Sequence, residues 1–258
     1  MAFGYVVYVY LTLPDVRSLA TAFPKTTAFM ELRKQEARAE GHSLPIRQQW
    51  VPYSRISPNL KRAVLVAEDG AFYQHDGLDY EQIKESIELN LEEGRMVRGA
   101  STITQQLAKN LYLSPSRNPI RKYKEVIITR RLEVALTKQR ILELYLNLIE
   151  WGDGVFGCEA AARAYFGKSA SALSPDEAAL LAGAIINPRL YSPARPNARL
   201  RRRQQLIGRR MGAVAPPSDG GVPAAAGPQD TGKQAPKTES NTPSTSARPV
   251  QLTKQPER

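Results

Sequence analysis

Apolar residues in the central part of this chain recur at helical spacing, and this pattern constrains the fold more than any other feature. Isoleucine and leucine occupy every fourth position in 83–91 and again in 103–111, which places each set along one face of a helix. Asp79 and Ser101 are predicted to cap these two helices, and Gly94 to end the first. Strand-like alternation is scarce, so we expect a mainly helical domain.

A later helix carries both start and stop signals. Ser174, Pro175 and Glu177 supply a cap, a first-turn proline and the reciprocal acid of a capping box. The apolar run 178–186 follows, and an Asn-Pro pair at 187–188 is expected to terminate it.

The composition changes abruptly after Met211. No aromatic residue occurs in 212–258, so this tail cannot bury a core and is expected to be disordered. We find no internal repeat in 14–211 and expect one domain there. The apolar stretch within 1–13 is too short for a spanning helix, which needs roughly 20 residues. We interpret it as the remnant of an N-terminal membrane anchor; a buried strand or helix start is the alternative.

The formal net charge of +11 requires an acidic partner, such as anionic lipid, nucleic acid or a phosphorylated substrate. The segment 199–210 is rich in arginine but contains no aromatic residue, so a lipid headgroup or glycan phosphate fits better than nucleic acid. A solvated helix face is the alternative. Cys158 is the only cysteine, and His42 and His75 are the only histidines, so we expect no disulfide and no metal site.

Three segments concentrate side chains of the kind that carry chemistry. In the first, Glu68 and Asp69 follow the apolar run 63–67 and open the sequence EDGAFYQHDG. An acidic pair at the end of a buried element can lie at the edge of a cleft, although most acidic pairs are solvated surface. His75, in the same sequence, is interpreted as a structural hydrogen bonder.

The second segment, 99–113, crowds hydroxyl and amide side chains around a helix start, which suits a site that grips hydroxyls or phosphates. A capped amphipathic helix is the alternative. The third surrounds Glu125 with cations, and the spacing of Arg121 and Glu125 places them on one helical face. It is either a cationic clamp beside a carboxylate or a surface salt bridge.

Together these segments resemble, in order and spacing, the motifs of the peptidoglycan glycosyltransferases (glycosyltransferase family 51), which include a domain of class A penicillin-binding proteins. The resemblance covers 51–193 and rests on EDGAFYQHDG, GASTITQQLAKN, RKYKE and ILELYLNLIEWGDGVFG followed by AAARAYFGK. The monofunctional biosynthetic transglycosylases are the most similar members. Neither Ser-x-x-Lys nor Lys-Thr-Gly occurs, so we expect no transpeptidase activity.

The resemblance implies a lysozyme-like helical domain with a small membrane-facing lobe. It also implies that the 4-hydroxyl of lipid II attacks a growing glycan chain held by undecaprenyl diphosphate, with inversion. Inversion requires a base on the face opposite the leaving group. By motif position Glu68 is that base, and Glu125 is the second carboxylate, which orients the reacting groups or assists the leaving group.

A diphosphate leaving group needs cations more than it needs a proton. The resemblance implies that this role belongs to Lys109, Arg117, Arg121 and Lys122. The other substrate-binding residues that it implies are Asp69, Ser101, Thr102, Thr104, Gln105 and Gln106. The later motif positions are expected mainly to shape the fold; they are Asn147, Gly152, Gly157 and 165–167. Tyr145 is expected to lie in the core.

The expected partners are lipid II, the growing undecaprenyl-diphosphate glycan chain and membrane lipids, with other cell-wall synthesis proteins as further candidates and no nucleic acid. No cofactor is required on this view, although a divalent cation, Mg²⁺ or Mn²⁺, can stimulate such a reaction. The domain is expected on the periplasmic or outer side of the bacterial cytoplasmic membrane, held by a single spanning segment.

Two rival functions remain open. A lysozyme-like hydrolase would also place two carboxylates across a helical cleft, but it would have no diphosphate for the cations to bind. A noncatalytic module that binds anionic membrane or nucleic acid would not need Glu68.

Overall fold

A computed structural model describes residue 4 and residues 11–94, 99–114 and 118–213. This part of the chain is mainly helical, as predicted, with one small sheet. In chain order its elements are η1 (Arg17–Ala20), α2 (Ala28–Ala39), β1 (Arg47–Gln48), η2 (Tyr53–Arg55), α3 (Pro58–Glu68), α4 (Tyr80–Glu92), α5 (Ile103–Tyr112), α6 (Pro119–Ala135), α7 (Lys138–Leu148), β2 (Glu150–Gly152), β3 (Val155–Phe156), α8 (Cys158–Phe166), η3 (Ala170–Ala172), α9 (Pro175–Ala184) and α10 (Ala198–Ala213).

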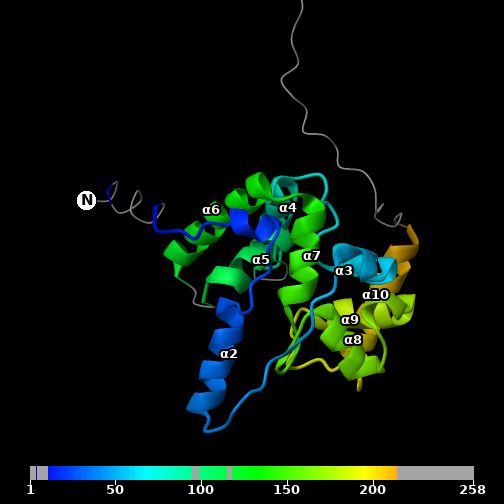
Figure 1. Cartoon of the computed structure of the whole chain (residues 1–258). Coiled ribbons are helices and arrows are strands. Elements are labelled where there is room, and N and C mark those ends of the chain that lie inside the picture. The colour runs from blue at the N-terminus through cyan, green and yellow to red at the C-terminus, as the bar shows by residue number, and fades with distance from the viewer. Residues whose placement is uncertain (1–3, 5–10, 95–98, 115–117, 214–258) are drawn as a thin grey trace, which may run out of the picture. The chain divides into compact units, whose positions relative to one another are not determined.

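The longer helices pack in two groups (Figure 1). In one group α5 lies against α6 and α7, and in the other α3 lies against α9 and α10. The apolar face predicted for α5 explains the first packing, because Ile103, Leu107 and Leu111 are almost completely buried. Both groups contribute to one hydrophobic core. Cys158 belongs to that core, and burial raises the pKa of its thiol to about 12.

A three-stranded sheet connects the chain before α3 with the loop after α7. β3 lies in the middle, parallel to β1 and antiparallel to β2. Gly157 follows β3 with a φ of 81°, and a Cβ there would lie 2.7 Å from the backbone oxygen of Asn147. The Asn147 side chain bonds to both backbone groups of Val51, and a Cβ on Gly152 would overlap the Tyr165 hydroxyl. The contacts of these motif residues are therefore ones that shape the fold.

Several predicted helix starts are confirmed. The Asp79 side chain accepts a hydrogen bond from the backbone N–H of Gln82 at the start of α4, and α9 begins with the predicted capping box. The prediction that Ser101 caps α5 is wrong. Thr102 is the N-cap, because its hydroxyl and the side chain of Gln105 bond reciprocally to the backbone and satisfy two free N–H groups.

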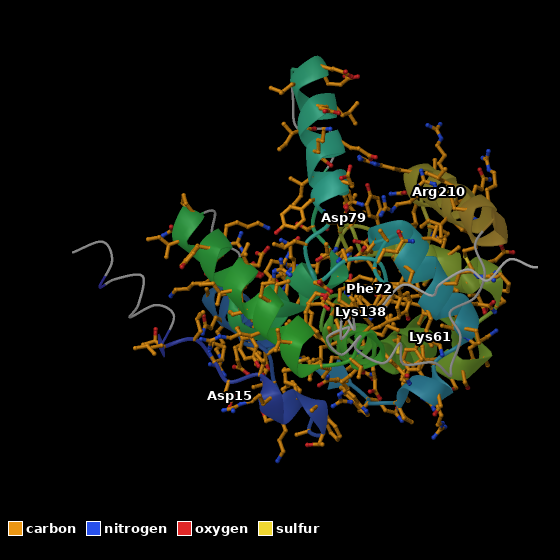
Figure 2. The ribbon with its side chains drawn as sticks, turned by 90° about the horizontal axis from the view of Figure 1, so that it is seen from above. Asp15, Lys61, Phe72, Asp79, Lys138 and Arg210 are labelled. Carbon is orange, nitrogen blue, oxygen red and sulfur yellow. The ribbon has the colours of Figure 1, made fainter. Side chains whose placement is uncertain are left out.

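α4 differs from the other long helices in how little of its apolar face is covered. Ile87 is 54% exposed and Leu91 is 76% exposed. Figure 2 shows this helix projecting from the rest of the ribbon above Asp79. Apolar residues gathered on a projecting element are typical of a surface that contacts lipid or another protein.

Some sequence predictions lie outside the described residues. They concern Arg117, most of the anchor remnant in 1–13 and nearly all of the tail in 212–258. Among the helices of the described ranges, none has both the length and the apolar character needed to cross a bilayer.

Candidate active site

Glu68 is the last residue of α3 and lies at the edge of a cleft of about 1040 Å³. The loop after α3, the first turns of α4 and one side of α10 line this space, which we call the α4/α10 cleft. Two of its lining residues, Asp79 before α4 and Arg210 on α10, are labelled in Figure 2. Glu68 and Asp69 both line it, so the acidic pair of the first motif borders a space large enough for a sugar substrate.

Two side chains hold the Glu68 carboxylate. The Gln106 amide donates to its Oε2 at 2.9 Å, and a guanidinium nitrogen of Arg203 lies 3.3 Å from its Oε1. Tyr145, fully buried on α7, donates its hydroxyl to the Gln106 Oε1 at 2.9 Å. This second bond turns the Gln106 NH₂ group toward Glu68. Contacts from α5 and α10, supported from α7, therefore leave only 12% of the Glu68 side chain exposed.

Burial raises the pKa of Glu68 above its usual value, because the charged form loses contact with water. The hydrogen bond from Gln106 and the charges of Arg203 and Lys109 act in the opposite direction. A carboxylate with a raised pKa beside a positioned cation is typical of groups that accept protons in active sites. Glu68 is therefore the candidate proton acceptor of the α4/α10 cleft.

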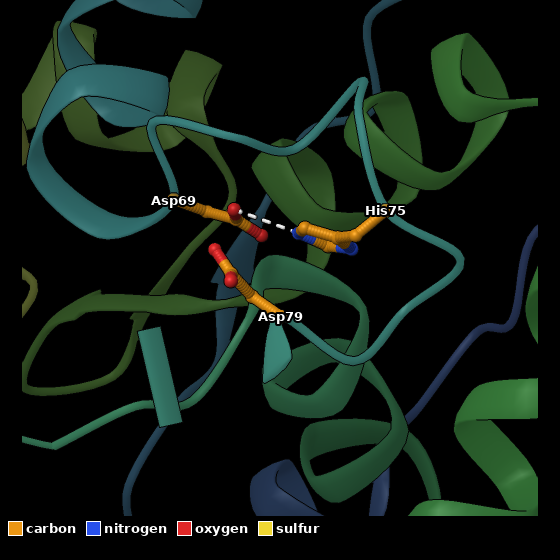
Figure 3. Close-up of side chains that lie close together, drawn as sticks. All are labelled: Asp69, His75 and Asp79. Atoms are coloured by element: carbon orange, nitrogen blue, oxygen red, sulfur yellow. Dashed lines mark hydrogen bonds and ion pairs between the residues drawn. The ribbon is translucent and has the colours of Figure 1, made fainter. Parts of the chain in front are cut away.

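Asp69, by contrast, binds the protein itself. Its oxygens accept hydrogen bonds from His75 Nε2 and from the backbone N–H of Ile103, each at 2.9 Å. Because the Gly77 N–H donates to His75 Nδ1, the ring proton lies on Nε2, facing Asp69. Figure 3 shows Asp79 beside this pair, and atoms of the three side chains lie within 4.8 Å of one another. Since both carboxylates already accept backbone N–H groups, we interpret the cluster as a lock that fixes the loop to the start of α5.

Most of the α5 residues predicted to bind substrate are buried against protein. Thr102, Thr104 and Gln105 are at most 3% exposed, and each forms hydrogen bonds within the fold. These bonds position α5, and the three side chains do not line the α4/α10 cleft. Ser101 and Gln106 do line it, so they are the members of this group that can contact a substrate there.

A second cluster of charge surrounds Glu125 on α6. Arg121 and Lys122 donate to its two oxygens at 2.7 and 2.6 Å, and 4% of the Glu125 side chain is exposed. Arg121 and Glu125 therefore lie on one helical face, as their spacing predicts. These three residues do not line the α4/α10 cleft.

Lys109 connects the two glutamates electrostatically. It lies one helical turn after Gln106 on α5. Burial lowers the pKa of Lys109, and the charges of Arg121 and Lys122 lower it further, whereas the charges of Glu125 and Glu68 favour its ammonium form. A partly desolvated lysine beside other cations can gain strongly from an incoming phosphate, which replaces the contacts that water no longer supplies.

Two residues of the site were not predicted from the sequence. Tyr145 is buried in the core, as expected, but its hydroxyl also belongs to the site. Arg203 falls in 199–210, which the sequence identifies only as a basic segment. Its spacing indicates that it lies on the buried face of the helix. Leu200 is three positions before it and Ile207 four positions after it, and both are buried on the same face.

The chain is similar to known proteins over most of its length. A family model described as Transglycosylase matches residues 11–212. A curated protein of Thiobacillus denitrificans, named biosynthetic peptidoglycan transglycosylase, is 51% identical over 194 residues, which are 75% of this chain and 84% of that protein. Proteins with the same name from Aromatoleum aromaticum and Laribacter hongkongensis are also similar. The first is 55% identical over 65% of this chain and 73% of its own length, and the second is 50% identical over 75% and 85%.

Proposed function

Because this chain belongs to the transglycosylase family, we propose that it polymerises lipid II into peptidoglycan glycan strands and does not cross-link them. The family supplies the reaction class, and the proposal adds the mechanism and the residues that perform it. Neither of the transpeptidase motifs occurs among its 258 residues, which supports the absence of cross-linking.

In the proposed reaction the 4-hydroxyl of an acceptor lipid II attacks C1 of the reducing-end sugar of the donor chain, and the bond from C1 to undecaprenyl diphosphate breaks. Glu68 accepts the hydroxyl proton on the face opposite the leaving group, so the configuration at C1 inverts. The raised pKa of Glu68 supports this role, since a more basic carboxylate accepts the proton more readily.

The leaving diphosphate binds Lys109, Arg121 and Lys122 in this proposal, with Arg117 as a further cation. These groups stabilise the negative charge that develops as the bond breaks. Glu125 holds Arg121 and Lys122 by ion pairs of 2.7 and 2.6 Å. We propose that it orients these cations toward the leaving group rather than donating a proton, because a diphosphate is already a stable anion.

One observation carries the proposal. Arg121 and Lys122 bind Glu125 at 2.7 and 2.6 Å, and Lys109 lies within the influence of these three charges and of Glu68. A candidate base and a set of anion-binding cations therefore lie close enough to act on one another. A hydrolase of neutral glycosidic bonds has no diphosphate to bind and no use for the cations. A binding module has no use for a carboxylate with a raised pKa.

We also propose that the domain works on the periplasmic or outer side of the cytoplasmic membrane, with a single-pass N-terminal anchor. The exposed apolar face of α4, including Ile87 and Leu91, supports contact with the acyl boundary of the membrane. Membrane lipids and other cell-wall synthesis proteins are its further partners in this proposal. No cofactor takes part, and adding Mg²⁺ or Mn²⁺ to the assay below measures any stimulation.

The test incubates the purified full chain with labelled lipid II in detergent and separates the products by size. A parallel reaction contains preformed glycan strands. A ladder of polymer, with the preformed strands intact, supports the transferase. Shortening of preformed strands without new polymer would replace it by the hydrolase, and the absence of both activities would favour the binding module.

A further inference from the structure

Arg203 contacts the candidate base but has no part in the reaction described above. It is separated from Glu68 by 135 positions in sequence, yet its guanidinium lies 3.3 Å from the carboxylate. Its Nε is buried without an acceptor among the described residues. An unsatisfied buried donor costs stability.

The fold delivers Arg203 to Glu68 on a firmly packed helix. Leu200, Ile207 and Met211 are buried along one side of α10, which packs against α3 and α9. Gly183 on α9 permits the close approach, since a Cβ there would lie 3.1 Å from the Leu200 side chain and 3.6 Å from the Cγ of Arg203. The backbone that carries the guanidinium is therefore held in place by a packed helix and not by a loop.

We propose that Arg203 is a positioning residue that keeps Glu68 ionised and aimed at the acceptor hydroxyl. Gln106 holds one carboxylate oxygen and Arg203 the other, so removal of either contact lets the side chain turn. This inference rests on the proposed function of Glu68 as the base.

The surroundings of Glu68 explain why a cation is needed there. Burial favours the protonated acid, which cannot accept a proton from the substrate. Arg203 is in direct contact with the carboxylate, whereas Lys109 acts on it through its charge alone. Three helices place polar or charged groups around Glu68: Gln106 and Lys109 lie on α5, Tyr145 on α7 and Arg203 on α10. The next residue in the chain is Asp69, whose carboxylate accepts hydrogen bonds from His75 and from the backbone N–H of Ile103.

The test measures kcat/KM for lipid II polymerisation by the full chain as a function of pH. Arg203→Met removes the charge, so the acid limb of the profile should move to higher pH by about 1 to 3 units, with activity recovered at high pH. Arg203→Lys keeps the charge and should keep the limb close to its wild-type position. Arg38→Met removes an exposed arginine on α2, outside the basic segment 199–210, and should leave the profile unchanged.

A residue that only stabilises α10 would lower the rate equally at every pH. A uniform loss in Arg203→Met with an unmoved acid limb would therefore overturn the proposal, as would an unchanged profile. If circular dichroism shows that Arg203→Met does not fold, Arg203→Gln replaces it. This variant keeps a hydrogen-bond donor without the charge, and its acid limb should also move to higher pH. A wild-type protein that forms no polymer at any pH would instead overturn the proposed function itself.

Discussion

Replacing Tyr145 by phenylalanine tests how the amide of Gln106 is held. The change removes one hydroxyl and leaves the ring in its fully buried site. That hydroxyl donates to the Gln106 Oε1 at 2.9 Å, while the Gln106 Nε2 donates to Glu68 at 2.9 Å. Without the first bond the amide can turn, and its oxygen would then face the carboxylate.

The size of the effect follows from the bond that would be lost. A hydrogen bond to a charged group contributes about 1.5–3 kcal/mol, which corresponds to about 10- to 150-fold in rate if the bond is needed in the transition state. We therefore expect kcat to fall by one to two orders of magnitude. The stability loss is smaller, about 0.5–1.5 kcal/mol for one net hydrogen bond, or a Tm lower by about 1–6 °C for a domain of this size.

Initial rates of lipid II polymerisation and thermal unfolding are measured on the same preparations. Tyr165→Phe is a matched control, because the Tyr165 hydroxyl donates to the backbone oxygen of Trp151 at 3.1 Å and not to a group that contacts Glu68. The control should lose a similar amount of stability and keep its kcat. Equal kcat values for the two variants would refute the reasoning, since the orientation of Gln106 would then be independent of Tyr145.

Lys109→Ala should lower kcat/KM for lipid II by about 100-fold or more, because a cation that stabilises the leaving diphosphate is lost; the same loss in Lys25→Ala, an exposed control, would contradict this assignment. Gly157→Ala should lower the Tm by the equivalent of about 1–3 kcal/mol, since the φ of 81° and the nearby backbone oxygen leave no place for a Cβ. Gly208→Ala, where a Cβ in α10 would meet nothing within 4 Å, should raise the Tm slightly. A Tm for Gly157→Ala above that for Gly208→Ala would contradict the packing described for Gly157. Glu68→Gln should be more stable than the wild type at neutral pH, because the raised pKa of Glu68 means that the wild type loses stability as the pH rises through that value. Below the ordinary glutamate pKa of 4.5 the Glu68 carboxyl is neutral in the folded and the unfolded state, so the stability difference between variant and wild type should vanish. Denaturant unfolding at several pH values measures this difference, and a difference that is the same at every pH would exclude ionisation as its cause.

The helices could be predicted from the sequence where side chains repeat locally. The apolar face 103–111 and the capping box of Ser174 and Glu177 depend on neighbours within a few positions, and both are found in the structure. The end of α9 could not be predicted equally well. The apolar run continues to 186, but the helix ends at Ala184, because a turn bond from the Asn187 N–H to the Ala184 oxygen follows and periodicity alone carries no signal for it.

The candidate site was harder to predict for two physical reasons. Thr102 and Gln105 have side chains that suit either substrate binding or helix capping, and only the surrounding structure identifies the capping bonds. Arg203 and Tyr145 reach the site across 135 and 39 positions of sequence. Contacts of that range arise from the packing of whole helices. A local pattern can place Arg203 on the buried face of its helix, but it does not identify Glu68 as its partner.

The most direct test of the account is the polymerisation of labelled lipid II by Glu68→Gln, measured beside the wild type and Glu40→Gln. Glu40 is exposed, so its variant controls for the loss of one carboxylate. The account predicts polymer ladders from the wild type and the control, and a rate lower by about 100- to 10,000-fold from a folded Glu68→Gln variant, as expected when a general base is removed. Ladders formed by Glu68→Gln at the wild-type rate would contradict the assignment of Glu68 as the base.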